Sequence, residues 1–153
     1  MNKNIYLFLS VSWLFSGCWT KSQTLDNPTY DFESDTLIWV DSSRNRTTPV
    51  AFYKPQIDSP RIIILSHGYG NNKPGSYLHY TYLADYLASK GYFVVSIHHE
   101  LSGDSAIPST GVPQIVRRPF WDRGADNILF VIQKLKKTNP GLDFEHIALI
   151  MSL

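Results

Sequence analysis

RIIILSHGYG (residues 61–70) is the stretch that decides the fold class. Its apolar run from Ile62 to Leu65 is typical of a strand that is buried on both faces of a parallel sheet. The glycines at positions 68 and 70 then indicate that the strand ends in a loop. Because ligands commonly sit where loops leave the carboxyl ends of parallel strands, this loop is the first place to look for function.

A helical pattern and a second strand follow the loop. Residues 77–90 place apolar side chains at helical spacing, and Gly91 favours a stop directly after them. The segment YFVVSIHHE (92–100) then predicts another buried strand. The apolar face expected of the helix consists of Leu78, Tyr82, Leu83, Tyr86 and Leu87.

The same alternation is repeated further along the chain. Residues 101–119 are rich in Gly and Pro and predict an irregular loop, after which helical spacing resumes over residues 120–137. The segment HIALI (146–150) opens a third buried strand. The expected apolar face of this second helix consists of Ile128, Val131, Ile132 and Leu135.

Two further strands are predicted upstream of residue 61. TLIWVD (36–41) and PVAFYKP (49–55) are rich in β-branched and aromatic residues and are separated by polar residues, as in a hairpin. A hairpin followed by strands that alternate with helices predicts the α/β class, with three parallel strands flanked by helices.

Composition and charge limit the classes of function. The chain has 153 residues, 43% of them hydrophobic, which is enough for one domain with a core. The formal charge is +1, with 14 basic and 13 acidic residues and no basic stripe, so no electrostatic feature supports nucleic-acid binding.

The N-terminal residues have the layout of an export signal. Lys3 precedes an apolar stretch, and the small residues Ser16 and Gly17 lead to Cys18, which predicts a signal peptide over residues 1–17. The context of Cys18 resembles the lipobox of bacterial lipoproteins, which implies a lipid on this cysteine and attachment to the membrane of the cell envelope. The alternative is plain secretion with a free thiol. Residues 18–35 are polar and predict a tether.

Two phosphate-binding interpretations of the loop fail on single residues. In a Walker A loop that runs from Gly70 to Gly75, Ser76 would stand where the phosphate-binding Lys is needed. In a dinucleotide fingerprint that starts at Gly68, Lys73 would stand in the place of the third glycine.

A third interpretation extends over most of the chain. ILSHGYG (64–70), GYFVVSIHHE (91–100) and FEHIALI (144–150), with the helices between them, resemble the N-terminal half of an α/β-hydrolase. The segment WVDSSRNRTTPVAFYKP (39–55) is similar to the start of bacterial relatives of platelet-activating-factor acetylhydrolases and dienelactone hydrolases. The resemblance implies serine-esterase chemistry on a small ester-like substrate, and serine hydrolysis needs no cofactor.

The resemblance also assigns roles within the loop. It implies that the backbone N–H of Tyr69 donates to the oxyanion of the tetrahedral intermediate. Gly68 and Gly70 would let the backbone turn and approach the substrate. The resemblance makes His67 an organiser of the loop rather than the catalytic base.

The polar residues after the second parallel strand have weaker functional interpretations. His98 and His99 are adjacent on a strand and therefore point to opposite faces, so we predict no metal site there. They are expected to pack in the loop or to line the substrate cleft. Asp104 comes too early in the chain for the acid of a hydrolase triad. Arg123 and Asp126 are expected to form an exposed ion pair.

The segment MSL (151–153) stands where the resemblance requires the nucleophile motif G-x-S-x-G. We therefore expect residues 36–153 to be an incomplete α/β-hydrolase domain. Its C-terminal half, with the nucleophile, acid and base, would be missing, and the isolated chain would be inactive. The alternative is a non-catalytic envelope lipoprotein that uses half of a hydrolase sheet for binding or interaction.

Overall fold

The computed structural model describes residues 28–151, so the predicted signal peptide and Cys18 lie outside the described residues. The elements in chain order are β1 (Phe32–Asp41), β2 (Arg46–Pro55), β3 (Arg61–Ser66), the 3-10 turn η1 (Ser76–Leu78), α1 (Thr81–Ser89), β4 (Phe93–Ile97), α2 (Pro113–Val116), α3 (Arg118–Thr138) and β5 (Asp143–Met151).

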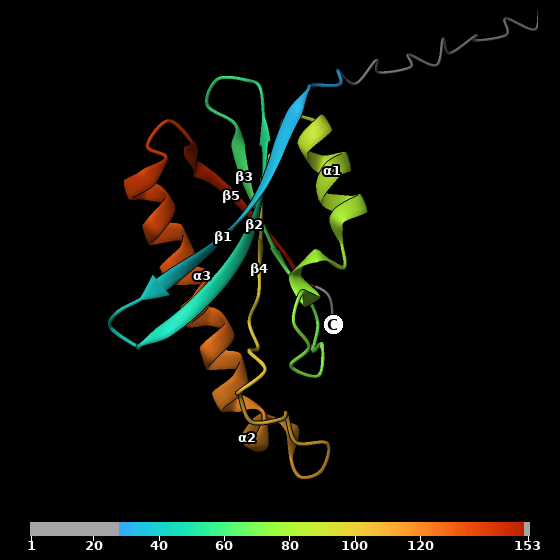
Figure 1. Cartoon of the computed structure of the whole chain (residues 1–153), viewed down its shortest axis with the longest axis vertical. Coiled ribbons are helices and arrows are strands. Elements are labelled where there is room, and N and C mark those ends of the chain that lie inside the picture. Colours follow the sequence, from blue (N-terminus) through green and yellow to red (C-terminus); the bar gives the residue numbers. More distant parts are fainter. Residues whose placement is uncertain (1–27, 152–153) are drawn as a thin grey trace, which may run out of the picture.

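The strands form one five-stranded mixed sheet in the order β1-β2-β4-β3-β5. β1 and β2 make the predicted antiparallel hairpin, and β2 continues antiparallel to β4. β3 lies between β4 and β5 and pairs parallel with both. The predicted α/β class, with a hairpin and three parallel strands, is confirmed (Figure 1).

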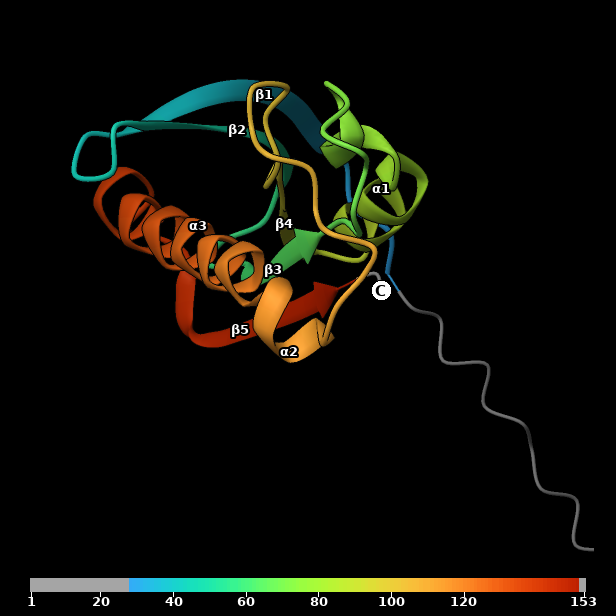
Figure 2. The ribbon, with the colours of Figure 1, turned by 90° about the horizontal axis from the view of Figure 1, so that it is seen from below.

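The helices cover opposite faces of the sheet, with α3 on one face and α1 on the other (Figure 2). Alternate residues of β3 therefore enter different cores, as the pleat of a strand requires. Ile62 and Ile64 pack with Val131 and Leu135 of α3. Ile63 and Leu65 pack with residues of α1. The uninterrupted apolar run is thus explained by cover on both faces.

The face that α1 buries differs from the prediction. Its buried residues are Ala84 and Ala88, whereas Tyr82 is 70% exposed and Tyr86 is 58% exposed. Leu83 and Leu87 are only partly buried beside the alanines. The small alanines let the helix backbone approach the sheet closely, and the larger tyrosines lie on the solvent side. The prediction for α3 is better, because Val131 and Leu135 are fully buried.

Element boundaries also differ from those expected. β1 begins at Phe32 rather than at residue 36, so the last residues of the predicted tether belong to the sheet. Before it, the Tyr30 N–H donates to the Ser89 carbonyl at 2.8 Å, which ties the chain to the end of α1. The short helix α2 lies within the predicted loop over residues 101–119.

Strand β5 is far less covered than β3. Ile147 is 36% exposed, Leu149 is 47% exposed and Met151 is 61% exposed. Within residues 28–151, β5 pairs with β3 only, so it is an edge strand there. None of the helices within that range is long and apolar enough to span a bilayer.

Candidate functional site

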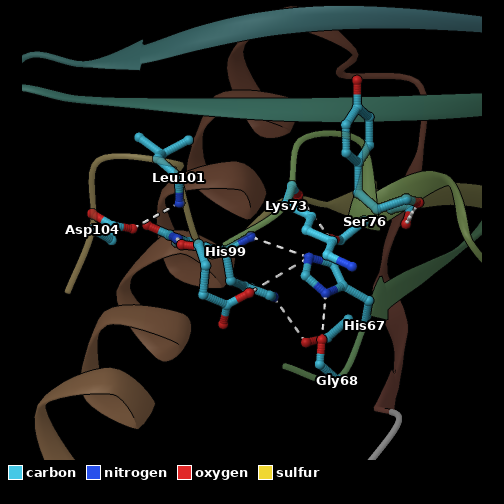
Figure 3. A network of polar contacts seen from close by, with 12 residues as sticks. His67, Gly68, Lys73, Ser76, His99, Leu101 and Asp104 are labelled. Carbon is cyan, nitrogen blue, oxygen red and sulfur yellow. Dashed lines mark hydrogen bonds and ion pairs between the residues drawn. The ribbon is translucent and has the colours of Figure 1, made fainter. Parts of the chain in front are cut away.

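The loop after β3 is a tight structure that depends on glycine. A Cβ at Gly70 would overlap the Oγ of Ser76 and lie 2.8 Å from its Cβ, so a side chain there would displace Ser76. The turn that follows holds Asn71 and Asn72 at φ 54° and 57°, in the left-handed region that Asn tolerates. The Lys73 N–H donates to the Gly70 carbonyl, and the Ser76 hydroxyl donates to the Lys73 carbonyl at 2.9 Å (Figure 3).

The ring of His67 lies buried beneath this loop, with only 2% of its side chain exposed. Its Nδ1 contacts the Gly68 carbonyl at 2.6 Å, so Nδ1 carries the proton and donates it. Its Nε2 then accepts from the His99 backbone N–H at 3.4 Å (Figure 3). Burial lowers the pKa of His67, in agreement with this neutral tautomer. These contacts fit the interpretation of His67 as a loop organiser.

Tyr69 is half exposed at the tip of the loop. Its hydroxyl accepts a hydrogen bond from the Ile107 N–H at 3.2 Å. Among residues 28–151, no acceptor takes a hydrogen bond from the Tyr69 N–H. Within the described part of the chain, this N–H is therefore left for a bound group, which the predicted role requires. The role itself stays a prediction.

The loop after β3 is fixed to the loop after β4. The Asn72 side-chain amide donates to the Asp104 carbonyl at 2.6 Å. The two loops run beside each other at one end of the sheet (Figure 2). Together with the contact between Tyr69 and Ile107, this bond ties the position of the first loop to that of the second.

Asp104 is the centre of a network that joins three parts of the chain. Its carboxylate accepts two hydrogen bonds from Arg46 of β2, at 3.0 and 2.7 Å, and lies 3.4 Å from Arg123 of α3. The Leu101 N–H also donates to it at 2.8 Å (Figure 3). The Arg46 hydrogen bonds are the largest cause that lowers the pKa of Asp104.

The expected pair of Arg123 and Asp126 is therefore wrong. Arg123 turns toward Asp104, and Asp126 instead lies 3.8 Å from Arg44. The predicted pair followed helical spacing alone, and the partner that the structure shows comes from a distant loop. Neither Arg46 nor the Asp104 network was found from the sequence, since their 58-residue separation leaves no local pattern.

His98 and His99 are both almost fully buried. Burial is the main cause that lowers the pKa of His98 to about 4 and that of His99 to about 3. Both rings lie close to the His67 ring, with centroids 5.5 and 5.7 Å away. No group of metal-ligating side chains among residues 28–151 has a geometry that could hold an ion.

Ser66 and His99 form a serine–histidine contact, at 2.8 Å between Oγ and Nε2. Both residues are buried at the end of the sheet. A catalytic base needs a pKa near the working pH, and that of His99 is far lower. The pair is therefore poorly suited to activate a nucleophile, and it fits a role in packing.

Comparisons with known proteins find solved structures with a similar fold. No family model and no curated protein matches the sequence. A bacterial heroin esterase superposes with a TM-score of 0.55 at 14% identity, over 86% of this chain and 37% of its own. S-formylglutathione hydrolase from Staphylococcus aureus superposes with a TM-score of 0.54 at 12% identity, over 80% of this chain and 49% of its own.

A dienelactone hydrolase-like promiscuous phosphotriesterase from metagenomic libraries gives a TM-score of 0.52 at 12% identity, over 78% of this chain and 48% of its own. The chain thus spans less than half the length of each of these three structures. At such identities the likeness concerns the fold. Residues 28–151 therefore adopt part of the α/β-hydrolase fold that these enzymes share.

Proposed function

We propose that this chain is the oxyanion-loop part of a serine hydrolase of the carboxylic-ester type, located in the cell envelope. The observation that carries the proposal is the loop after β3. There the Tyr69 N–H has no acceptor among residues 28–151, at the carboxyl end of a central parallel strand. The fold that the chain shares with esterases supports the proposal.

The chemistry follows from the charge that ester hydrolysis creates. When a nucleophile attacks an ester carbonyl, the carbonyl oxygen becomes negatively charged, and a backbone N–H that is already in place stabilises that charge. The neutral ring of His67 holds the Gly68 carbonyl, so the backbone on the N-terminal side of Tyr69 is fixed before substrate arrives. The nucleophile, acid and base would be supplied by residues other than 28–151.

The first test concerns the gene. The nucleotides after the Leu153 codon are read in all three frames. A G-x-S-x-G motif followed by Asp and His codons supports the proposal. A stop codon with no such motif in any frame contradicts it and favours the alternative of a non-catalytic envelope lipoprotein.

The second test concerns the Tyr69 N–H in the full gene product. Tyr69→Pro removes the N–H, and we expect kcat for p-nitrophenyl acetate to fall about a hundredfold to a thousandfold. Tyr69→Phe is the matched control, because it keeps the N–H and loses only the hydroxyl that contacts Ile107. Equal rates for the two variants, with both folded by circular dichroism, would contradict the assigned role.

The envelope location rests on Cys18, which we propose carries lipid. Expression in a bacterium fed with labelled fatty acid should label the chain. Cys18→Ser should remove the label and release the chain from the membrane fraction. An unlabelled wild-type chain in the soluble fraction would leave plain secretion as the explanation.

A further inference from the structure

An open pocket lies next to the candidate oxyanion loop, where the hairpin of β1 and β2 meets the loop after β4. Its volume is about 530 Å³, within the range of small-molecule sites. Its lining comes from four segments: β1, β2, the residues just before and within η1, and the loop after β4. Residues 67–70 do not line it, although Pro74 and Gly75 of the same loop do.

Flat and apolar groups make up much of the pocket wall. Pro49 of β2, Pro74 and Tyr77 contribute rings, and Ile38 and Leu101 contribute aliphatic side chains. Of these rings, only that of Tyr77 is aromatic and can stack with an aromatic ligand. The two proline rings can make apolar contacts with it. The wall therefore favours a flat apolar molecule over a branched or highly hydrated one.

His98 gives the pocket a specific polar group. The residue is only 4% exposed, and its Nδ1 is buried without a hydrogen-bond partner. No hydrogen bond within residues 28–151 uses its Nε2 either. Burial lowers the pKa of His98 to about 4, so at pH 7 the ring is neutral and has one donor and one acceptor. Nδ1 is too deeply buried for a ligand to reach, so a ligand hydroxyl can bond to Nε2 only.

The pocket offers no unpaired charge. Asp104 also lines it, but two hydrogen bonds from Arg46 neutralise that carboxylate. Thr47 and Ser102 also line the pocket. Both carry hydroxyl groups, which bind neutral polar ligands as readily as charged ones. An uncharged ligand therefore fits the lining better than a carboxylate or an amine.

From this lining we infer that the pocket binds a small uncharged aromatic alcohol of the phenol type. Its ring would lie against Pro49, Pro74 and Tyr77, and its hydroxyl would bond to the His98 imidazole. The inference goes beyond the proposed function, because binding requires no nucleophile and no turnover.

Two glycines make a matched test possible. Gly103 lines the pocket, and Gly141 lies in the turn before β5. A Cβ added at either position has no atom within 4 Å, and neither glycine has a positive φ. Both substitutions should therefore be tolerated without strain. Gly103→Trp adds a bulky side chain at the wall of the pocket, and Gly141→Trp adds the same side chain away from it.

The experiment is a titration of the ¹⁵N-labelled protein with phenol, followed by NMR. We expect saturable shifts at His98 and Tyr77 in the wild type and in Gly141→Trp. Gly103→Trp should weaken binding at least about tenfold. If that variant does not fold, Ser102→Phe, on the same exposed stretch of loop, serves in its place. Undiminished binding in a folded pocket-filled variant would overturn the inference.

Two further compounds test the chemical class. Toluene lacks the hydroxyl and should bind more weakly than phenol, because it leaves the His98 ring without a partner. Benzoate carries a charge and should also bind more weakly. Toluene binding equal to phenol would overturn the role of His98, and stronger binding of benzoate would overturn the preference for an uncharged ligand. Absence of saturable phenol binding to the wild type would overturn the site.

Discussion

Strands β4 and β5 both pair parallel with β3, yet they differ sharply in burial. Every residue of β4 is buried, whereas Leu149 and Met151 of β5 are 47% and 61% exposed. Val95 and Leu149 both lie opposite Ile64, one on each side of it. Two apolar runs of similar composition thus have different surroundings, because β4 has a second neighbour in β2 and β5 has none within residues 28–151.

The largest effect is expected from introducing the same charge on the two strands. Val95→Asp would place an unpaired carboxylate in the core and should lower the free energy of unfolding by more than about 4 kcal/mol. Leu149→Asp should change it by less than about 1 kcal/mol, because water reaches that position. Urea unfolding measures both values. Similar losses for the two variants would show that β5 is as well covered as β4.

A second prediction concerns pH and the histidines that follow β4. The folded-state pKa of His98 is about 4 and that of His99 is about 3, both below the ordinary value of 6.5. As the pH falls below 6.5, the unfolded chain binds protons that the folded chain does not. Stability should therefore fall by about 1 kcal/mol per pH unit for each of these residues.

Glu100 has the opposite effect, because burial raises the pKa of its carboxyl group in the folded state. Protonation of Glu100 as the pH falls therefore stabilises the folded chain and offsets part of the slope. Urea unfolding between pH 7 and pH 5 measures the sum. His98→Gln should flatten the slope, because it removes one of the groups whose pKa is lowered in the folded state. A slope that His98→Gln does not alter would contradict the assigned burial of this ring.

The third prediction concerns the edge of β5 that has no partner strand within residues 28–151. An exposed apolar edge strand is a template for pairing with another chain. Leu149→Lys should therefore reduce self-association severalfold in light scattering at high protein concentration. Leu129→Lys is the control, because Leu129 is 57% exposed on α3, where the backbone is already paired. An equal reduction by both variants would indicate a general effect of charge.

The smallest effect is expected at Ser66. The 153-residue chain should hydrolyse p-nitrophenyl acetate no faster than the background, because the low pKa of His99 makes it a poor base for Ser66. Ser66→Ala should leave that background rate unchanged. A rate above background that Ser66→Ala abolishes would show that this buried pair is catalytic.

The sequence predicted those parts of the fold that depend on local patterns, such as a run of apolar residues in a strand. Ile62 to Leu65 were expected in a doubly covered strand and are buried there. The prediction of the buried face of α1 was wrong, because spacing alone does not distinguish tyrosines that pack in the core from tyrosines that face solvent. Ala84 and Ala88 carried little signal, although they are the buried residues of α1.

Within the site, the sequence predicted the loop but not what holds it in place. Gly70 was identified, and its contact with Ser76 explains why a side chain does not fit there. The bonds from Arg46 to Asp104 and from Asn72 to Asp104 join residues that are far apart in the chain. Such contacts follow from tertiary structure and leave no periodic pattern in the sequence.

The position of β3 between two later strands has a consequence for synthesis on the ribosome. β3 ends at Ser66, whereas its partners begin at Phe93 and Asp143. At about 5–20 residues per second, several seconds pass before the second partner has been translated. During this time the apolar strand β3 has at least one unpaired edge, and exposed apolar segments of this kind are what chaperones bind.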